Sequence, residues 1–471
     1  MTPLCRVAIF AACFASAGSL NACKDFLTAQ NPGAVAVERL EDSSLVDLMH
    51  NSAIAGLQGM NNFWYSYLSA TFTDELRNHH VFIDEVLYDQ RRVDVANSYN
   101  SVFTYGPIQR ARWLADSVAG RMRTIYADSA LHDVRLARVY AIAGYQLIRL
   151  AEGWCEVPIS TAESKYSAPV PSIELFKLAE ARFDSAIKIA AAARTANAAV
   201  ASTTLGQRYM LASDSIRNLA YVGKARAALG RNDKVTAAAI AQLVAPIGTG
   251  TNFEYRMYYN SNLSLGLHNL WAERLAGGAG VTAASISNTP FLALDDARVP
   301  HPINATTGAP ATETTQSGAA VVPNSPLMFS TFSGTKAGAD PTYETAMVLA
   351  SLLEAKYIIA EAEGPTATNI AFIESRRLAF PSITAATPTT VDNYMTNLIE
   401  QRGRDFFLDG HRIGDLRRWS KYAGISNRWP TGAYLGSATV TFGSVMCWPL
   451  NAAEITNNPL VPKPYTPPLG P

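Results

Sequence analysis

The chain has 471 residues, of which 48% are hydrophobic and 17% charged, and its 39 Lys and Arg residues balance its 39 Asp and Glu residues. The apolar fraction excludes global disorder, because it suffices for a large buried core. The net charge of zero excludes a general nucleic-acid binder, which needs an excess of cations to displace the counterions of phosphate. The length suits one large domain or two or three of average size.

Residues 1–22 are typical of the export signal of a lipoprotein. Arg6 supplies a positive start, and the uncharged run over 7–20 is too short to span a bilayer but suits a signal. The run ends in LNAC, which is similar to a bacterial lipobox and predicts that Cys23 is the lipid-modified first residue. A plain secretory signal with an incidental cysteine is the alternative. Because no further apolar run of about 18 residues follows, we expect a domain tethered to a membrane by its lipid.

Two cysteines remain once the signal and the lipidation site are set aside. They are Cys155 and Cys447, and an exported protein can join two such thiols. A disulfide between them would close a loop over most of the chain and contribute up to about 5 kcal/mol. Two separate thiols agree with the sequence equally well.

Helical periodicity dominates two stretches, about 108–245 and 346–420, which predicts a mostly α-helical scaffold. In 133–152 apolar residues recur every three or four positions and form one stripe. Further helices are predicted from Ser172 as a cap, over about 214–229, from Asp233, over 346–363 and over 366–379. Helices of this length in pairs, joined by runs such as AALGRNDKVTAAAIA, are similar to tetratricopeptide hairpins.

The segment between these stretches, about 248–345, has a different composition. Its part from 276 to 345 holds seven Gly, seven Pro and only seven charged residues, and it has no helical period. Because a simple connection inside a compact domain is rarely so long, we expect a loop-rich insert with short strands. Loops on a rigid scaffold often carry binding function.

The densest group of charges lies near the C-terminus, where nine of the 19 residues from Glu400 to Arg418 are Asp, Glu or Arg. Every cation there is arginine, whose planar guanidinium pairs two-pronged with carboxylates. We therefore predict a partly buried ion network, in preference to an acid–base active site containing His411. Its expected members are Glu400, Arg402, Arg404, Asp405, Asp409, Arg412, Asp415 and Arg418. Asp405 and Asp409, four residues apart on the predicted helix, need a cation between them, for which Arg412 and His411 are the candidates.

The run EQRGRDFFLDGHRIGDLRRW (400–419) resembles the C-terminal signature of the SusD/RagB family of outer-membrane lipoproteins, and the eight network residues fall on its positions. The tail WPLNAAEITNNPLV (448–461) and the run WCEVP (154–158) resemble further motifs of that family. The resemblance covers nearly the whole chain. It implies a single SusD-like domain over 23–471, with four tetratricopeptide-like pairs and a ligand-facing insert. We also hypothesise from it that Cys155 and Cys447 meet in a disulfide.

The resemblance also implies a function. Members of the family sit in the outer membrane, facing the cell surface, capture an oligosaccharide or another nutrient and pass it to a SusC-like TonB-dependent transporter. They are not enzymes and need no cofactor. By region, the resemblance places ligand contacts after the segment TDEL (73–76) and in the later insert, where aromatic faces and polar edges suit a sugar. The candidates are Arg77, Asn78, His79, His80, Phe82, Tyr88, Tyr258, Tyr259 and Trp271, with Trp64, Tyr65 and Tyr67 forming a cluster that suits the core as well as a site.

Two other functions compete with this interpretation. A helical-repeat adaptor of the cell envelope would bind another protein and no nutrient. A secreted helical glycoside hydrolase would need two carboxylates framed by aromatic residues in a cleft, and no such pair is recognisable. Motifs for a nucleophile, a metal, a nucleotide or a dinucleotide are absent from the sequence.

Overall fold

The computed structural model describes residues 37–161, 163–260, 284–291, 296, 298–299, 306–307, 313–314, 320–321, 344–380, 388–425 and 427–468. The predicted signal, Cys23 and Trp271 lie outside these residues, so the expected boundary after residue 22 stays a prediction. The chain divides into two compact units, Met1–Leu45 and Val46–Pro471. The described part of the first holds two short 3-10 helices, Val37–Glu41 and Ser43–Leu45. All other elements belong to the second unit.

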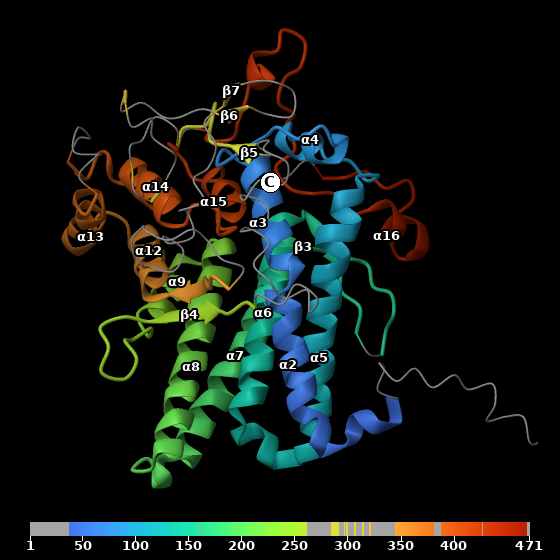
Figure 1. Ribbon diagram of the computed structural model, residues 1–471, viewed down its shortest axis with the longest axis vertical. Coiled ribbons are helices and arrows are strands. Elements are labelled where there is room, and N and C mark those ends of the chain that lie inside the picture. The colour runs from blue at the N-terminus through green and yellow to red at the C-terminus, as the bar shows by residue number, and fades with distance from the viewer. Residues whose placement is uncertain are drawn as a thin grey trace, which may run out of the picture. The chain divides into compact units, whose positions relative to one another are not determined.

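Helices make up most of the second unit, which confirms the predicted mostly α-helical fold (Figure 1). The α-helices are α2 Val46–Gln58, α3 Met60–Phe72, α4 Ile83–Asp89, α5 Gly106–Tyr126, α6 Val134–Gly153, α7 Ser172–Ala196, α8 Thr204–Gly230, α9 Lys234–Ala241, α12 Leu352–Glu363, α13 Ala367–Leu378, α14 Tyr394–Asp405, α15 Arg412–Trp419 and α16 Ala452–Asn457. A π-helix, Asn100–Tyr105, leads into α5, and 3-10 helices cover Ala127–His132, Ala198–Val200 and Tyr434–Gly436.

Side-chain caps fix where several helices begin. The carboxylate of Asp133 accepts a hydrogen bond from the backbone at the start of α6, and Asp233 does the same for α9 as predicted. The hydroxyl of Thr203 caps α8 in the same way. The predicted cap at Ser172 is wrong, because its hydroxyl donates to the carbonyl of Trp154 and Pro171 takes the cap position.

The long helices pack side by side as antiparallel neighbours, with α6 between α5 and α7 and with α8 beyond α7 (Figure 1). Phe183 of α7 is fully buried between two glycines. A Cβ added to Gly144 of α6 would lie 2.7 Å from its ring, and one added to Gly223 of α8 would lie 2.3 Å from it. The missing side chains of these two glycines therefore leave room for the phenylalanine ring between the helices.

Three helix boundaries differ from the sequence predictions. Helices α2 and α3 precede the predicted start of the scaffold at 108. Helix α3 was not predicted because its residues 63–72 are almost all buried, so no polar face gives the sequence a helical period. Helix α8 begins ten residues before the predicted 214. The predicted helix over 346–363 opens instead with strand β8, whose apolar run MVLAS pairs with β4.

The strands are short and form two-stranded antiparallel pairs. They are β1 Arg77–Asn78 with β5 Ala284–Ser285, β2 Glu156–Pro158 with β3 Pro169–Pro171, β4 Glu254–Met257 with β8 Met347–Ser351, and β6 Glu313–Thr314 with β7 Ala320–Val321. The first pair matters for the site, because Arg77 lies opposite Ser285 and ties the segment after α3 to the predicted insert. Figure 1 shows α4, β5, β6 and β7 together at one end of this unit.

A disulfide and two tryptophans join the segment after α6 to the closing segment. Cys155 and Cys447 form the disulfide, with their Cα atoms 5.3 Å apart. The adjacent Trp154 and Trp448 make a parallel β-bridge, and their buried rings meet edge to face at 4.8 Å. The two regions that the family resemblance brings together are therefore in contact.

Candidate ligand-binding site

A cavity of about 440 Å³ opens where three distant segments of the chain meet. The first segment leads from α3 into β1, the second follows β5, and the third is the loop over 427–442, which follows α15 after a short turn. Its polar and aromatic lining includes Asp74, Arg77, Asn288, Asn427, Arg428 and Phe442. A cavity of this size with a few converging polar groups is the usual form of a small-molecule site.

Arg77 lines this cavity and is bound by several neighbours. Its Nη1 donates to Asp89 Oδ1 at 3.0 Å and to the carbonyls of Thr73 and Leu76, and its Nε donates to the carbonyl of Asn288. Its remaining nitrogen, Nη2, makes no hydrogen bond to the described residues. The guanidinium is therefore held in place with one donor left for a ligand.

Asp89 connects Arg77 to the loop over 427–442. Besides Arg77, it accepts hydrogen bonds from the backbone of Asn78 at 2.7 Å and from the hydroxyl of Tyr434 at 2.9 Å. Burial raises the pKa of the Asp89 carboxyl, and Arg77 offsets part of that rise. Phe442, on the same loop as Tyr434, has its ring 5.1 Å from the guanidinium carbon of Arg77. One buried carboxylate thus binds the arginine of the site and Tyr434, whose ring packs edge to face on Phe442 at 5.4 Å.

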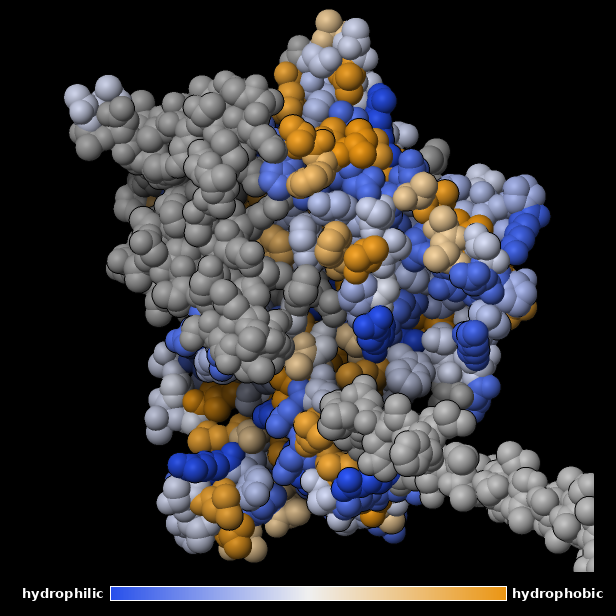
Figure 2. Space-filling model, turned by 45° about the vertical axis from the view of Figure 1, so that its right-hand side comes forward, coloured by the Kyte–Doolittle hydropathy of each residue, from blue (hydrophilic) through white to orange (hydrophobic). Residues whose placement is uncertain are grey.

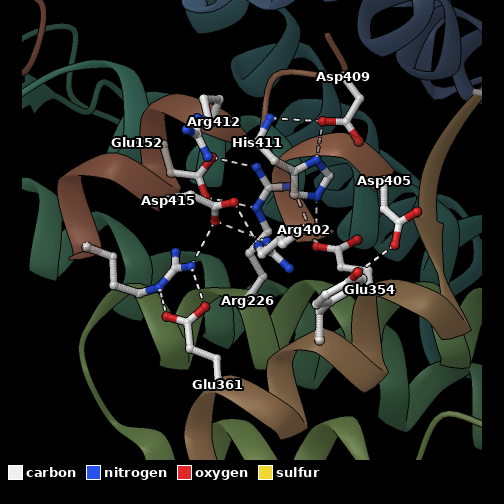
Figure 3. A network of polar contacts seen from close by, with 12 residues as sticks. Glu152, Arg226, Glu354, Glu361, Arg402, Asp405, Asp409, His411, Arg412 and Asp415 are labelled. Carbon is white, nitrogen blue, oxygen red and sulfur yellow. Dashed lines mark hydrogen bonds and ion pairs between the residues drawn. The ribbon is translucent and has the colours of Figure 1, made fainter. Parts of the chain in front are cut away.

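The C-terminal charge cluster forms a buried network between α6, α8, α12, α14 and α15 (Figure 3). Arg402 binds both oxygens of Asp415, at 2.7 and 3.1 Å, and Arg418 binds Asp415 at 2.8 Å and both oxygens of Glu361. Burial would raise the pKa of Asp415, but the two arginines outweigh it and hold that pKa well below its ordinary value. These charges are mutually neutralised and lie between helices, as a structural network requires.

His411 extends the network as a cation between two carboxylates. Its Nδ1 lies 2.6 Å from Asp409 and its Nε2 lies 2.9 Å from Glu354, which also faces Arg226 at 3.6 Å. Burial and Arg226 would lower the pKa of His411, but the two carboxylates raise it to about 9. His411 is therefore already protonated at neutral pH and cannot accept a proton as a catalytic base.

Two details of the predicted network are wrong. Asp409 is not four residues along a helix from Asp405, because α14 ends at Asp405. Arg412 does not lie between them, because it binds both oxygens of Asp74 at 2.7 and 2.6 Å. Asp405 is instead neutralised by Arg298 and Arg376, and Glu400 pairs with Arg404 at 3.3 Å.

Solved structures of other proteins share this architecture. No family model matches the sequence, and no curated protein does. A solved SusD superfamily protein from Bacteroides vulgatus aligns with a TM-score of 0.59 over 90% of this chain and 98% of its own, at 14% identity. A SusD-like carbohydrate-binding protein from Bacteroides fragilis aligns with a TM-score of 0.62 over 90% and 99%, at 11% identity. The chain has the SusD-like fold. A laminarin-binding SusD-like protein aligns with a TM-score of 0.54 over 89% and 98%, at 14% identity.

Within the SusD-like fold, the candidates after α3 divide into buried and accessible residues. Tyr88 is wrong as a ligand contact, because it is fully buried and packs edge to face on Trp448. Asn78 is also buried, and its side-chain amide donates to the carbonyl of His80. Of these residues, Arg77 lines the cavity and Phe82 is exposed.

The two histidines that follow are engaged in local contacts. His79 Nε2 lies 2.7 Å from the hydroxyl of Ser285, and burial lowers the pKa of His79 to about 4, so its ring is neutral. His80 pairs with Glu85 at 3.4 Å. In the described part of the chain no group of three or more His, Cys, Asp or Glu side chains could hold a metal ion.

The later aromatic candidates lie elsewhere. Tyr258 and Tyr259 directly follow β4, which Figure 1 shows beside α8 and α9 and away from β5. Tyr258 is exposed, and the hydroxyl of Tyr259 contacts the sulfur of Met347 at 3.6 Å. The structure therefore does not bring these tyrosines into the cavity with Arg77. Trp271 lies outside the described residues.

Of the cluster upstream, Tyr65 and Tyr67 are buried in the core, whereas Trp64 is half-exposed. Trp64 stacks on Phe103 of the π-helix at 4.5 Å and meets Tyr99 edge to face at 5.4 Å. These three rings form a second aromatic surface near α4.

None of the helices within the described residues is both long and apolar enough to cross a membrane.

Four further residues line the cavity and were not predicted from the sequence: Asn288, Asn427, Arg428 and Phe442. The signal near them was weak: the run NRWPTGAYLGSATVTFG (427–443) holds turn residues and aromatics typical of a structured loop. Nothing in the sequence ties that run to β1, which lies more than 300 residues earlier in the chain.

Proposed function

We propose that this protein is a non-catalytic lipoprotein of the outer membrane that captures an oligosaccharide and passes it to a SusC-like TonB-dependent transporter. The cavity at Arg77 and Phe442 is the capture site. Cys23 carries the lipid, and the protein faces the cell surface. The observation that carries the proposal is this cavity, held open by a buried ion pair on a SusD-like scaffold.

The chemistry of the lining suits a sugar better than a reaction. Asn288 and Asn427 offer amide donors and acceptors to hydroxyl groups, and Phe442 offers an apolar ring to the CH face of a pyranose. Asp74, the one carboxylate among the described lining residues, is bound on both oxygens by Arg412. It therefore has no role as a general acid or base in glycoside cleavage.

Calorimetric titration with a panel of oligosaccharides tests the proposal. Phe442→Ala is expected to weaken the best ligand at least about tenfold, because it removes the ring of the site. Tyr258→Ala is the matched control, since it removes an exposed aromatic that lies outside the cavity. Equal affinity for wild type and Phe442→Ala, or loss only in Tyr258→Ala, would place the site elsewhere. Sugar release during incubation would make the protein an enzyme.

The anchor and the transporter need separate tests. Cys23→Ser is expected to move the protein from the membrane fraction to the soluble fraction of the envelope, because the lipid supplies its membrane affinity. Crosslinking in intact cells, followed by mass spectrometry, is expected to yield a large β-barrel transporter. Cys23→Ser protein that stays in the membrane fraction would contradict lipidation at that residue.

A second function, an envelope adaptor without a small-molecule ligand, is favoured by one surface. Three consecutive apolar residues at the start of α4 are exposed: Val81 by 62%, Phe82 by 53% and Ile83 by 65%. Figure 2 shows apolar side chains gathered near one end of the molecule, just below its uppermost loop. Exposed apolar patches mark protein contacts. A protein partner lost on Phe82→Ser, together with no binding across the sugar panel, would favour this alternative.

A further inference from the structure

The charges of the described residues that line the cavity do not cancel. The ionisable residues among them are Asp74, Arg77 and Arg428. Asp74 is neutralised by Arg412, and Arg77 is neutralised by Asp89 at 3.0 Å. Arg428 makes no hydrogen bond and no ion pair with any residue that the structure describes. Among the described residues, one positive charge therefore remains at the cavity without a counter-ion.

The neighbours of Arg428 are held in place, although its own guanidinium has no partner among the described residues. On one side the side chain of Asn427 accepts a hydrogen bond from the backbone of Trp429 at 3.0 Å. On the other, the carbonyl of Pro430 accepts one from Arg91 at 2.7 Å, and the guanidinium of Arg91 lies 4.7 Å from the ring of the buried Trp429. The backbone that carries Arg428 is thus fixed before any ligand binds, which reduces the entropy lost on binding.

The environment of Arg428 favours an anion over a neutral group. Its side chain is only partly exposed, and its Nε is buried without an acceptor among the described residues. A buried donor that lacks an acceptor is destabilising, more so when it is charged. A carboxylate matches the planar fork of arginine with two parallel hydrogen bonds, which a hydroxyl cannot do.

We propose that the ligand captured in this cavity is an acidic saccharide, an oligosaccharide with uronic acid residues, and that Arg428 binds its carboxylate. Asn288 and Asn427 then bind hydroxyl groups of the same sugar, and Phe442 packs on its ring. This inference rests on the proposed capture function and adds the chemical class of the ligand. Arg428 is its specificity-determining residue.

The test uses oligomers of galacturonate, glucuronate and mannuronate, each beside its carboxyl-reduced form, which is neutral and has the same linkages. Calorimetric titration at low salt is expected to give at least about tenfold tighter binding of one acidic oligomer than of its reduced form. The difference is expected to shrink at high salt, because ions screen the attraction. Arg428→Gln is expected to reduce this preference to within about twofold, because it weakens binding of the acidic oligomer far more than binding of the reduced form. Arg428→Lys keeps the charge but not the fork and is expected to retain part of the preference.

Arg92→Gln is the matched control, since Arg92 is an exposed neighbour that contacts Thr441 of the same loop and does not line the cavity. It is expected to leave the preference intact, and unchanged melting temperatures check the folding of every variant. Binding of neutral oligosaccharides alone would overturn the acidic class and leave the capture function standing. Equal loss of both ligand forms in Arg428→Gln would also overturn it. No binding of any sugar would overturn both proposals.

Discussion

The pair of Arg402 and Asp415 allows a quantitative test of the buried network. In Asp415→Asn the side chain keeps its shape but loses its charge, so the fully buried Arg402 and its neighbour Arg418 lose the three hydrogen bonds to a carboxylate that Asp415 accepts. Removing one partner of a buried ion pair costs about 3–5 kcal/mol. At about 2.1 cal/mol/K per residue, the unfolding entropy of a chain of this length is about 1 kcal/mol/K. The melting temperature should therefore fall by about 4 °C.

Differential scanning calorimetry at pH 7 measures this change. Asp47→Asn is the control, because it makes the same chemical change at a residue whose side chain is 75% exposed and pairs with Arg135 at 2.6 Å. Exposed pairs contribute about 1 kcal/mol or less, so the control should melt within about 1 °C of wild type. The reasoning is refuted if Asp415→Asn also melts within 1 °C of wild type, or if both variants fall equally.

Three further predictions concern stability. Replacing Cys155 and Cys447 together by Ser should lower the free energy of unfolding by up to about 5 kcal/mol in urea melts, and thiol reagents should label neither cysteine in the unreduced wild type; labelling of both would contradict the disulfide. Since the folded pKa of His411 is about 9 and its ordinary value 6.5, its stabilisation should be complete below about pH 6.5 and lost as pH rises through about 9, and His411→Gln should flatten urea-melt stability over that window. Gly223→Ala should cost about 1–3 kcal/mol by overpacking, whereas Gly120→Ala, where an added Cβ meets nothing within 4 Å, should stabilise by about 0.5–1 kcal/mol; equal melting temperatures would contradict this.

The scaffold could be predicted where a helix keeps one polar face. Helix α6 spans Val134–Gly153 against a predicted 133–152, because its apolar stripe and the cap at Asp133 are both local signals. Helix α3 was missed because it is buried nearly all round. The start of α12 was misplaced because the apolar run of β8 suits a buried helix as well as a buried strand. Periodicity reports exposure to water, so it fails where an element has no exposed side.

The site could be predicted only in part, for a different reason. Arg77 was found because a family resemblance marks the segment after α3, whereas Arg428 and Phe442 reach the same cavity through the tertiary fold alone. Tyr88 was expected in the site because aromatic residues suit sugars, but the same ring suits a core, and here it packs on Trp448. Residue type alone does not separate these two uses.

Two groups of residues near the cavity have different roles. The signature that resembles the SusD/RagB motif stabilises the cavity wall, whereas other residues line the cavity itself. Arg412 of the signature binds Asp74 in the cavity wall, and the backbone of Leu408 donates to Glu75 beside it at 2.9 Å. Both contacts tie the cavity wall to the signature, and the first neutralises Asp74. Arg428 comes nine residues after the signature ends and carries the uncompensated charge. The motif that indicates the fold therefore cannot name the ligand, and the class of sugar must be read from the loop that follows it.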